Sequence, residues 1–384
     1  MSFLLKNLAQ RAFGTGPVSV RPFDELPPVG PVSDRSVGPG ANGHPEIRPP
    51  GSGEIASAPA DTCDYFPTHS LLGQSPEPIL ANGQPALPSS SVGKSARRRL
   101  FSLTDAGVAG DDAVIYVPSQ RVAIEETVRQ WSGPANRHPL LAAPRFPAAE
   151  SLPGLSLSIG SLDAGGFYHF LMESLPRLHL AQGWLDQVDH VLANGSPGSF
   201  QERWLARAGI PTAKIRWLAG HTHFRCEQLL FTNLLCADLE PTPWLVAAIR
   251  SVLHRPNVER AGSRRIWISR SDAAARRFTA ENSLLKDLND FERVELARLS
   301  PADQIALMAD ASVIAGPHGA GLANLIFCAP GTRVIELMPD LRQRPLFGRL
   351  SIAVGCKHAW ASVNFDHPEE NVSDLASAIR AYIG

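Results

Sequence analysis

The sequence predicts an α/β fold with two Rossmann-like domains facing a cleft, preceded by a Pro/Gly-rich, largely irregular N-terminal region. Strand and helix patterns alternate from about residue 155, and the alternation restarts after residue 263. Prolines and glycines concentrate ahead of both runs. The expected parts are a disordered or loosely ordered segment (1–60), a small irregular, β-containing extension (61–154), and the two Rossmann-like domains (155–258 and 259–384).

The N-terminal region lacks a regular hydrophobic period. Of the 33 prolines, 15 fall in the first 100 residues, together with 11 of the 31 glycines. Stretches such as PPVGPVSDRSVGPGANGHPEIRPPGSG cannot bury much apolar surface, so we expect residues 14 to about 60 to be disordered or loosely draped. DDAVIYVP (111–118) is the first expected strand, and RVAIEETVRQW after it has the spacing of a helix.

The first alternating run opens with a helix, FYHFLMESLPRLHLAQGWL (167–185), which Pro176 is expected to kink or break. Proline at the first turn after Thr242 marks another helix start. The elements expected after the first helix are a strand (188–193), a helix (199–210), two strands (214–219 and 227–233) and a helix (242–253). Alternation of this kind implies a parallel sheet covered by helices on both faces.

The second run follows RPNVERAG, where we expect the break between the domains. Its expected strands are 264–270, 292–299, 311–316, 332–339 and 357–362. Its expected helices are 280–290, 300–310, 321–329, 344–355 and 367–383. Ser300 has the position of an N-cap.

The bulk composition excludes several classes of protein. Charged residues make up 19% of the 384 residues and the formal net charge is -1, which does not favour nucleic acid as a partner. The five cysteines include no C-x-x-C pair, which argues against a disulfide framework and a structural zinc and suits a reducing compartment. No stretch approaches the roughly 20 apolar residues that span a bilayer. Residues 1–13 could form an interfacial helix or targeting segment, but we favour a frayed start.

A glycine-rich turn in the second run could bind an anion. In AGPHGAGLANLIFCAPGTRVIELMP (315–339), Gly319, Ala320 and Gly321 lie between a strand and a helix start, where unpaired N–H groups point outward. The spacing is not that of dinucleotide enzymes, and no Walker lysine follows. The turn is either a phosphate site, with His318 as a donor, or plain packing of a strand against a helix, with His318 bonded to a backbone carbonyl.

Charged residues near the same sheet edge add to this candidate site. Arg270 ends its strand, and a guanidinium binds phosphate oxygens bidentately. Arg276 and Arg277 follow in a loop, and the alternative is that all three belong to a solvated basic loop. Glu336 could accept ribose hydroxyls, or it is an edge carboxylate in water.

A second candidate lies on the first helix of the alternating region. His169 and Glu173 are four residues apart and therefore share one helix face. Such a pair can hold a carboxylate as general base, with the imidazole orienting it or binding substrate. Many helices contain such a pair by chance. No D-x-D occurs in the chain, so a metal is not indicated.

Three stretches together resemble glycosyltransferase family 61. They are FYHFLMESLPRL, then RIWISRSDAAARR with ENSLL after it, and GPHGAGLANLIFCAPGTRVIEL, in the order and approximate spacing of that family. The family includes bacterial proteins labelled capsular polysaccharide biosynthesis and eukaryotic transferases of xylose and N-acetylglucosamine. The resemblance covers about residues 155–384 and not the first 110.

The resemblance implies a GT-B-like fold and an inverting, metal-independent transfer from a nucleotide-diphosphate sugar, without a cofactor. The first Rossmann-like domain would bind the acceptor, with Glu173 as the suspected base and His169 beside it. The second would bind the diphosphate. The residues expected at the donor are Arg270, His318, Gly319, Ala320, Gly321, Asn324 and Glu336.

The expected partners are the sugar donor and a glycan or polysaccharide acceptor, lipid-linked ones included. The expected location is the cytoplasm, with the inner face of the membrane as an option. Two other readings stay open. One is a sugar-nucleotide epimerase or hydrolase on the same fold, and the other is a non-catalytic protein that binds glycans or nucleotides.

Overall fold

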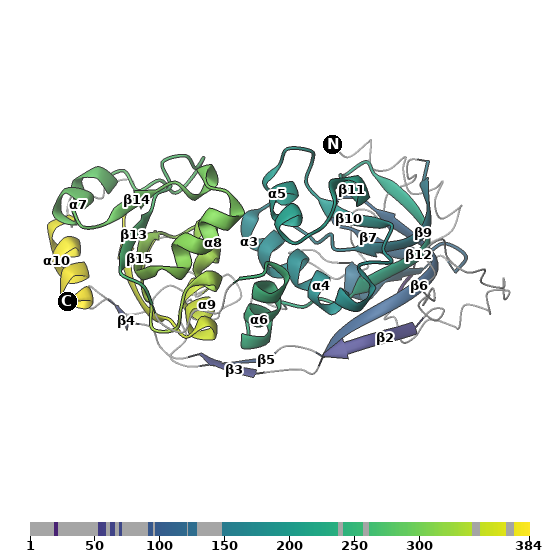
Figure 1. Cartoon of the computed structure of the whole chain (residues 1–384), viewed down its shortest axis with the longest axis horizontal. Coiled ribbons are helices and arrows are strands. Elements are labelled where there is room, and N and C mark those ends of the chain that lie inside the picture. Colours follow the sequence, from purple (N-terminus) through teal and green to yellow (C-terminus); the bar gives the residue numbers. More distant parts are fainter. Residues whose placement is uncertain are drawn as a thin grey trace. The chain divides into compact units, whose positions relative to one another are not determined.

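The computed structural model divides into two compact units (Figure 1), Met1–Ala60 with Ala96–Leu235 (unit 1) and Asp61–Ser95 with Cys236–Gly384 (unit 2). The structure describes residues 19–21, 53–58, 62–65, 69–70, 91–94, 97–120, 122–128, 148–236, 241–255, 261–339, 346–365 and 372–384. The domain limits expected from the sequence, and the cleft between the domains, stay predictions.

Unit 1 is built on a mixed sheet. Its described strands are β1 (Ser19–Arg21), β2 (Gly53–Ala58), β6 (Arg98–Ala109), β7 (Val114–Val117), β8 (Val122–Ile124), β9 (Glu150–Ser158), β10 (His190–Asn194), β11 (Ile215–Leu218) and β12 (His223–Thr232). Their order is β1-β8-β7-β6-β12-β9-β10-β11, with β2 paired to β6. Strands β12, β9, β10 and β11 are mutually parallel, whereas β6 is antiparallel to β12, β7 and β2.

The strands of the first alternating run, β10, β11 and β12, are thus parallel as expected, but strands from before residue 155 join them and make the sheet of unit 1 mixed. Strand β6 pairs with β12 from Leu100 to Ala109, and its residues are buried at most positions on both faces. A strand buried on both faces does not alternate apolar and polar residues, so β6 could not be recognised from its sequence pattern. DDAVIYVP does contain a strand, β7, but β6 precedes it.

One further expectation near the N-terminus is corrected. RVAIEETVRQW was expected to be helical, but its described residues form strand β8 and a single 3₁₀ turn, Glu125–Thr127. Strand β8 pairs with β7, and pairing along a sheet outweighs a weak helical spacing. Strands β1 and β2 lie in the segment expected to be disordered or loosely ordered, most of which is outside the described residues, so that expectation stays a prediction.

The helices of unit 1 follow the expected order. They are α3 (Phe167–His169), the π-helical turn η4 (Phe170–Ser174), α4 (Leu175–Leu180), α5 (Phe200–Arg207) and the 3₁₀ turns η5 (Gln182–Trp184) and η6 (Thr212–Lys214). The helix continues through Pro176 instead of breaking. Because proline has no N–H to donate, a widened turn ahead of it is a physically reasonable way to continue the helix.

Unit 2 contains a fully parallel sheet, as expected from its alternating pattern. Its strands β13 (Arg264–Ile268), β14 (Glu292–Val294), β15 (Ala311–Pro317), β16 (Arg333–Pro339), β17 (Lys357–Val363) and β4 (His69–Ser70) lie in the order β14-β13-β15-β16-β17-β4. A separate antiparallel pair is formed by β3 (Thr62–Tyr65) and β5 (Ser91–Lys94).

The helices of unit 2 are α6 (Pro243–Val252), α7 (Glu281–Asp287), η8 (Leu296–Arg298), α8 (Pro301–Ala309), the 3₁₀ helix η9 (Ala320–Phe327), α9 (Leu346–Val354) and α10 (Val372–Ile383). The predicted cap of α8 is confirmed, since Ser300 Oγ accepts a hydrogen bond from the Asp303 N–H at 3.2 Å. The expected strand 292–299 is confirmed only at its start, because its second half forms η8.

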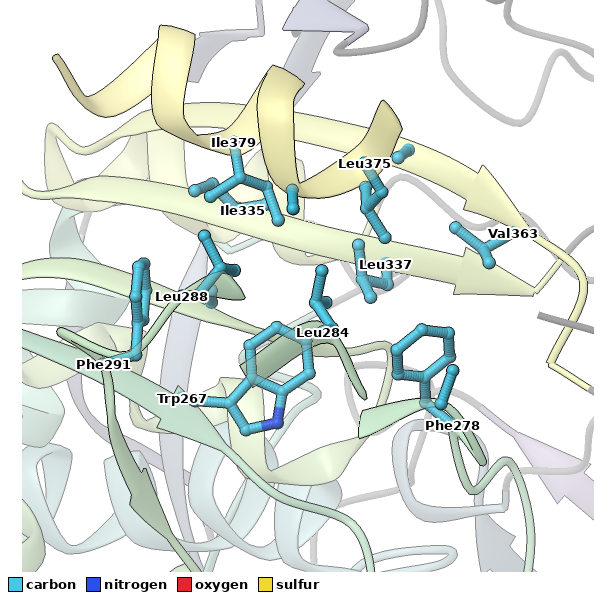
Figure 2. Close-up of a cluster of buried hydrophobic side chains, with 14 of the residues drawn as sticks. Trp267, Phe278, Leu284, Leu288, Phe291, Ile335, Leu337, Val363, Leu375 and Ile379 are labelled. Carbon is cyan, nitrogen blue, oxygen red and sulfur yellow. The ribbon is translucent and has the colours of Figure 1, made fainter. Parts of the chain in front are cut away.

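The core of unit 2 joins α7 and α10 to one face of the parallel sheet. Leu375 and Ile379 of α10 face Ile335 and Leu337 of β16 (Figure 2). Leu284 of α7 is fully buried in the same cluster. This packing fixes the end of β13 and the start of α7, between which Arg270 lies.

Each helix in the described ranges is too short or too polar to cross a bilayer.

We expect Leu284→Ala to lower the free energy of unfolding by about 2–5 kcal/mol, because it leaves a cavity in this core. Ser283→Ala, at an exposed position of the same helix, is the control and should change stability by no more than about 0.5 kcal/mol. Urea unfolding of both variants measures the difference. Equal effects of the two substitutions would contradict the packing of α7 on the sheet.

Candidate active site

Arg270 and His318 lie at the point in the sheet of unit 2 where the strand order reverses. The chain runs from β13 to β14 on one side, and then returns to β15 on the other side of β13. In open α/β sheets such a topological switch point opens a crevice beyond the carboxyl ends of the two strands, and ligands bind there. Arg270 follows the end of β13 by two residues, and His318 directly follows β15.

Arg270 and Gly319 are in contact at this switch point. A Cβ built on Gly319 would lie 1.9 Å from Nη1 of Arg270, so any other residue here would displace the guanidinium from this position. Gly316, inside β15, is required for a similar reason, because a Cβ there would lie 2.6 Å from the carbonyl oxygen of Ile268. These two glycines therefore allow close packing, and this packing brings the cation to the strand ends.

The charge of Arg270 is not balanced by a carboxylate in the described part of the chain. Its Nη2 donates to the carbonyl oxygen of Ala275 at 3.0 Å, and its Nε is buried without a hydrogen-bond partner there. Burial lowers the pKa of this guanidinium and the neighbouring Arg276 lowers it further, while Asp272 opposes them. Arginine stays protonated despite such shifts, so an anion would relieve the cost of this half-buried charge.

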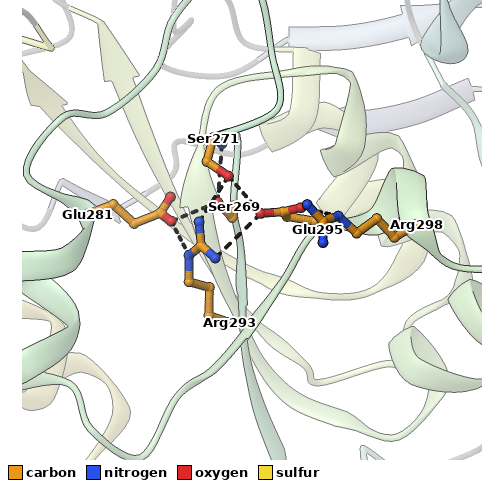
Figure 3. Close-up of polar contacts among 6 residues, drawn as sticks. All are labelled: Ser269, Ser271, Glu281, Arg293, Glu295 and Arg298. Atoms are coloured by element: carbon orange, nitrogen blue, oxygen red, sulfur yellow. Dashed lines mark hydrogen bonds and ion pairs between the residues drawn. The ribbon is translucent and has the colours of Figure 1, made fainter.

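The residues on either side of Arg270 are anchored by carboxylates (Figure 3). Ser269 Oγ donates to Glu281 Oε1 at 2.7 Å, and Ser271 Oγ donates to Glu295 Oε1 at 2.8 Å. Both anchoring carboxylates come from neighbouring segments, the start of α7 and the end of β14. The backbone of Arg270 is therefore held from both sides.

Arg293 links the two anchors. Its Nε donates to Glu281 Oε1 at 2.5 Å, and its Nη2 donates to Ser271 Oγ at 2.9 Å. Arg298 adds an ion pair to Glu295 at 2.5 Å (Figure 3). Glu281 and Glu295 are thus engaged with Arg293 and Arg298.

The glycine-rich turn leads into a 3₁₀ helix, whose first N–H groups have no partner within the helix. Ala320 and Gly321 are partly exposed at this start, whereas Gly319 is buried. Asn324 is fully buried, and its Nδ2 donates to the carbonyl oxygen of Gly321 at 3.1 Å. Its contact is thus with the backbone of the turn.

His318 and Glu336 form part of a buried chain of polar groups. His318 Nδ1 lies 2.5 Å from Glu336 Oε1, and the carboxylate is completely buried. His358 Nε2 lies 3.2 Å from Glu336 Oε2, an ion-pair contact whose geometry falls short of a hydrogen bond. Ser351 Oγ is 2.9 Å from His358 Nδ1. Both sequence interpretations of Glu336 assumed an accessible carboxylate, whereas a ribose hydroxyl would have to displace an imidazole to reach it.

The charge of Glu336 is stabilised by its histidines. Burial alone would raise the pKa of this carboxyl, but the interactions with His318 and His358 outweigh it and hold the pKa below its ordinary value. With Nδ1 donating to Glu336, His318 can also donate to an anion through Nε2 only when the imidazole is protonated. His318 is 4% exposed and directly follows β15.

The candidate pair in unit 1 lies at a second switch point. Strands β9, β10 and β11 follow one another across the sheet, and the chain then returns to β12 on the other side of β9. Glu173 is completely buried, and it accepts hydrogen bonds from His169 Nδ1 at 2.9 Å and from Ser161 Oγ at 2.5 Å. Ser161 lies in the segment after β9, and its N–H donates to Asn194 Oδ1 at the end of β10. The predicted contact between His169 and Glu173 is confirmed.

Several partners of the predicted residues carried no sequence signal. Ser161 contacts Glu173 from 12 positions away, and His358 approaches Glu336 from the next strand. The two serines that flank Arg270 were the only visible hint of its anchoring, because hydroxyls next to a strand end commonly bond to neighbouring side chains.

In the part of the chain that the structure describes, no group of three or more His, Cys, Asp or Glu side chains could hold a metal ion. His318 and His358 both contact Glu336, but each faces a different carboxylate oxygen at a hydrogen-bonding distance.

Parallel strands with a cation and a glycine-rich turn at a switch point are typical of α/β proteins that bind phosphate-containing ligands. Residues 167–335 match the family model Glycosyltransferase 61. This match confirms the resemblance to glycosyltransferase family 61 that was seen in the sequence.

Two curated relatives match shorter stretches. A β-1,2-xylosyltransferase of Arabidopsis thaliana is 44% identical over 52 residues, and a β-1,2-xylosyltransferase of Oryza sativa subsp. japonica is 36% identical over 55 residues. Each match covers 14% of this chain and 10% of the relative. The chain thus spans a tenth of the length of these relatives.

We expect the stabilising effect of Glu336 to depend on pH. Its pKa is lowered in the folded state, so its contribution is present above the ordinary value of 4.5 and is lost as the pH falls through the folded pKa. Glu336→Gln should therefore be less stable than wild type by about 1–3 kcal/mol near pH 7, and this deficit should shrink below about pH 4.5. Urea unfolding across this range measures it.

Glu125→Gln, at an exposed position, is the control for the loss of one negative charge. A deficit of Glu336→Gln that is constant from pH 7 to pH 3.5 would show that the ionised carboxylate is not the stabilising form.

Proposed function

We propose that this protein is a glycosyltransferase that moves a sugar from a nucleoside-diphosphate sugar to a hydroxyl of a glycan or polysaccharide. The observation that most supports this proposal is Arg270, a half-buried cation without a carboxylate partner in the described residues, packed against Gly319 at the switch point between β13 and β15. Both residues lie in the region that matches glycosyltransferase family 61.

The leaving diphosphate gives this cation a chemical role. As the bond from the anomeric carbon to the phosphate oxygen breaks, negative charge grows on the diphosphate, and fixed donors lower the barrier by stabilising it. Arg270, the N–H groups of Gly319, Ala320 and Gly321, and Nε2 of His318 in its protonated form would supply these donors. Asn324 would act on the turn through its bond to Gly321, and Glu336 would act by holding His318.

The finer parts of this proposal follow the family. We propose a GT-B-like protein whose second Rossmann-like domain (259–384) binds the donor and whose first (155–258) binds the acceptor. Transfer would be inverting and metal-independent, with the proton acceptor in the pair His169 and Glu173. The acceptor would be a capsular or related polysaccharide, free or lipid-linked, and the reaction would take place in the cytoplasm or at the inner face of the membrane.

The names of the two plant relatives suggest the sugar. Both are β-1,2-xylosyltransferases, so a nucleoside-diphosphate pentose is the first donor to try. The hexose and N-acetylhexosamine donors form the rest of the panel.

A thermal-shift screen followed by a transfer assay tests the proposal. The probes are UDP, GDP and a panel of their sugars. A ligand at 100 times its Kd stabilises the protein by about 2.7 kcal/mol, which a melting curve detects. We expect a nucleoside diphosphate and at least one of its sugars to raise Tm, and that donor to yield a glycoside with an acceptor. A flat response to the whole panel would contradict the proposal.

The other two readings give different results in the same assay. Free sugar or an isomerised donor formed without an acceptor would indicate a hydrolase or epimerase. Binding of a nucleotide sugar without turnover over a broad acceptor panel would indicate a non-catalytic binding protein.

We expect Arg270→Met to weaken binding of the nucleoside diphosphate roughly 10- to 150-fold, because one charge-assisted contact contributes about 1.5–3 kcal/mol. Gly319→Ala should weaken it as well, since the new methyl group displaces the guanidinium. In the Arg270→Met background, Gly319→Ala should add little. Titration calorimetry with the nucleoside diphosphate measures all four proteins.

The controls are Arg277→Met, which removes one exposed charge from the same loop, and Gly183→Ala, where an added Cβ meets nothing within 4 Å. Both should keep the wild-type affinity within about twofold. Fully additive effects of the Arg270 and Gly319 substitutions would show that the glycine does not act through the arginine.

A further inference from the structure

The two members of the unit 1 pair differ in how a substrate could reach them. The side chain of Glu173 is 0% exposed, whereas that of His169 is 21% exposed. A hydroxyl arriving from solvent therefore meets the imidazole. To reach the carboxylate, it would have to displace a hydrogen bond from Ser161 or from His169.

The contacts of Glu173 also determine the state of the imidazole. A carboxylate that accepts from a serine hydroxyl at 2.5 Å and from a ring nitrogen at 2.9 Å is bonded as an ion with two donors. In the neutral imidazole the nitrogen that donates to Glu173 is Nδ1, and the lone pair then lies on Nε2. This tautomer is the one in which His169 can accept a proton at Nε2.

Hydrogen bonds from other segments of unit 1 fix the position of Glu173. Glu173 lies in the π-helical turn η4, and its own carbonyl oxygen accepts from Arg177 Nε at 2.9 Å. Ser161 approaches from the segment after β9, and its N–H is fixed by Asn194. Asn194 in turn donates to the carbonyl oxygen of Asp111 at 2.5 Å. Widened π-helical turns occur frequently at functional sites.

We propose that His169 Nε2 is the proton acceptor of the reaction and that Glu173, held by Ser161, is a positioning residue. The inference rests on the proposed function, because it requires an acceptor hydroxyl. The hydroxyl proton moves to Nε2 as the oxygen lone pair forms the bond to the anomeric carbon. The bond from that carbon to the phosphate oxygen breaks, and its electron pair leaves with the nucleoside diphosphate. Glu173 then stabilises the imidazolium through Nδ1.

The first test reads the tautomer without any activity. Nitrogen-15 NMR of the histidine rings distinguishes a ring nitrogen with a proton from one without, and the His169 signals are assigned by their loss in His169→Gln. We expect the neutral ring to have its proton on Nδ1 in wild type. In Glu173→Gln we expect a mixture of tautomers, because the charge that favours Nδ1–H is gone. A proton on Nε2 in wild type would overturn the proposal.

The second test measures turnover with the donor and acceptor found in the transfer assay. His169→Gln keeps a polar side chain next to Glu173 but cannot accept a proton, so kcat should fall about 10²- to 10⁴-fold. Added imidazole should restore part of the activity of His169→Ala. The affinity for the nucleoside diphosphate should stay within about twofold in both variants, because the proposed donor residues lie in unit 2. His221→Gln, at an exposed position of unit 1, is the control and should keep the wild-type kcat.

The outcomes separate this inference from the proposed function. If His169→Gln keeps most of its kcat while Glu173→Gln loses it, the carboxylate is the proton acceptor and the inference is wrong, although the transferase proposal stands. If wild type binds donor but transfers no sugar to any acceptor, the proposed function fails and the proton-transfer role fails with it. Loss of kcat in His169→Gln with rescue of His169→Ala by imidazole, together with the Nδ1–H tautomer, supports it.

Discussion

The close approach of the chain after β15 to the end of β13 is the constraint on which the donor half of the candidate site depends. A Cβ at position 316 would collide with the Ile268 carbonyl oxygen, and a Cβ at position 319 would collide with the Arg270 guanidinium. Packing and phosphate binding were alternatives for this glycine-rich turn. In the structure they are compatible, because the small residues pack the strand ends so closely that a cation lies beside the turn and at the switch point.

Each unit contains a fully buried glutamate bonded to a histidine, and the two pairs differ in ways that suit different tasks. Glu336 lies between His318 and His358, which offset the cost of burying its charge, and His318 is itself almost completely buried. Glu173 faces Ser161 and a partly exposed His169. A buried carboxylate that loses a hydrogen-bonding partner is strongly destabilised. Each imidazole is therefore held with its Nδ1 toward the carboxylate. A fixed orientation is what a donor to a diphosphate and an acceptor of a proton both require.

Much of the fold after residue 155 could be predicted because its elements have local signals. The proline after Thr242, the Ser300 cap and the apolar runs of β15 and β16 each mark an element within a few residues. The antiparallel half of the unit 1 sheet could not be predicted in the same way. Strand β6 has no alternation, and most of its length pairs with β12, more than 100 positions later in the chain, which no local window contains.

The sequence by itself determined the parallel sheet of unit 2, the four-residue spacing that joins His169 to Glu173, and the resemblance of residues 167–335 to glycosyltransferase family 61. Only the tertiary structure decided that Glu336 is buried between two histidines and that Glu173 is bonded to Ser161. The reason is that burial and hydrogen bonding of a carboxylate depend on side chains from other strands and loops. The sequence shows which groups are present, and the packing of distant segments decides which of them a substrate can reach.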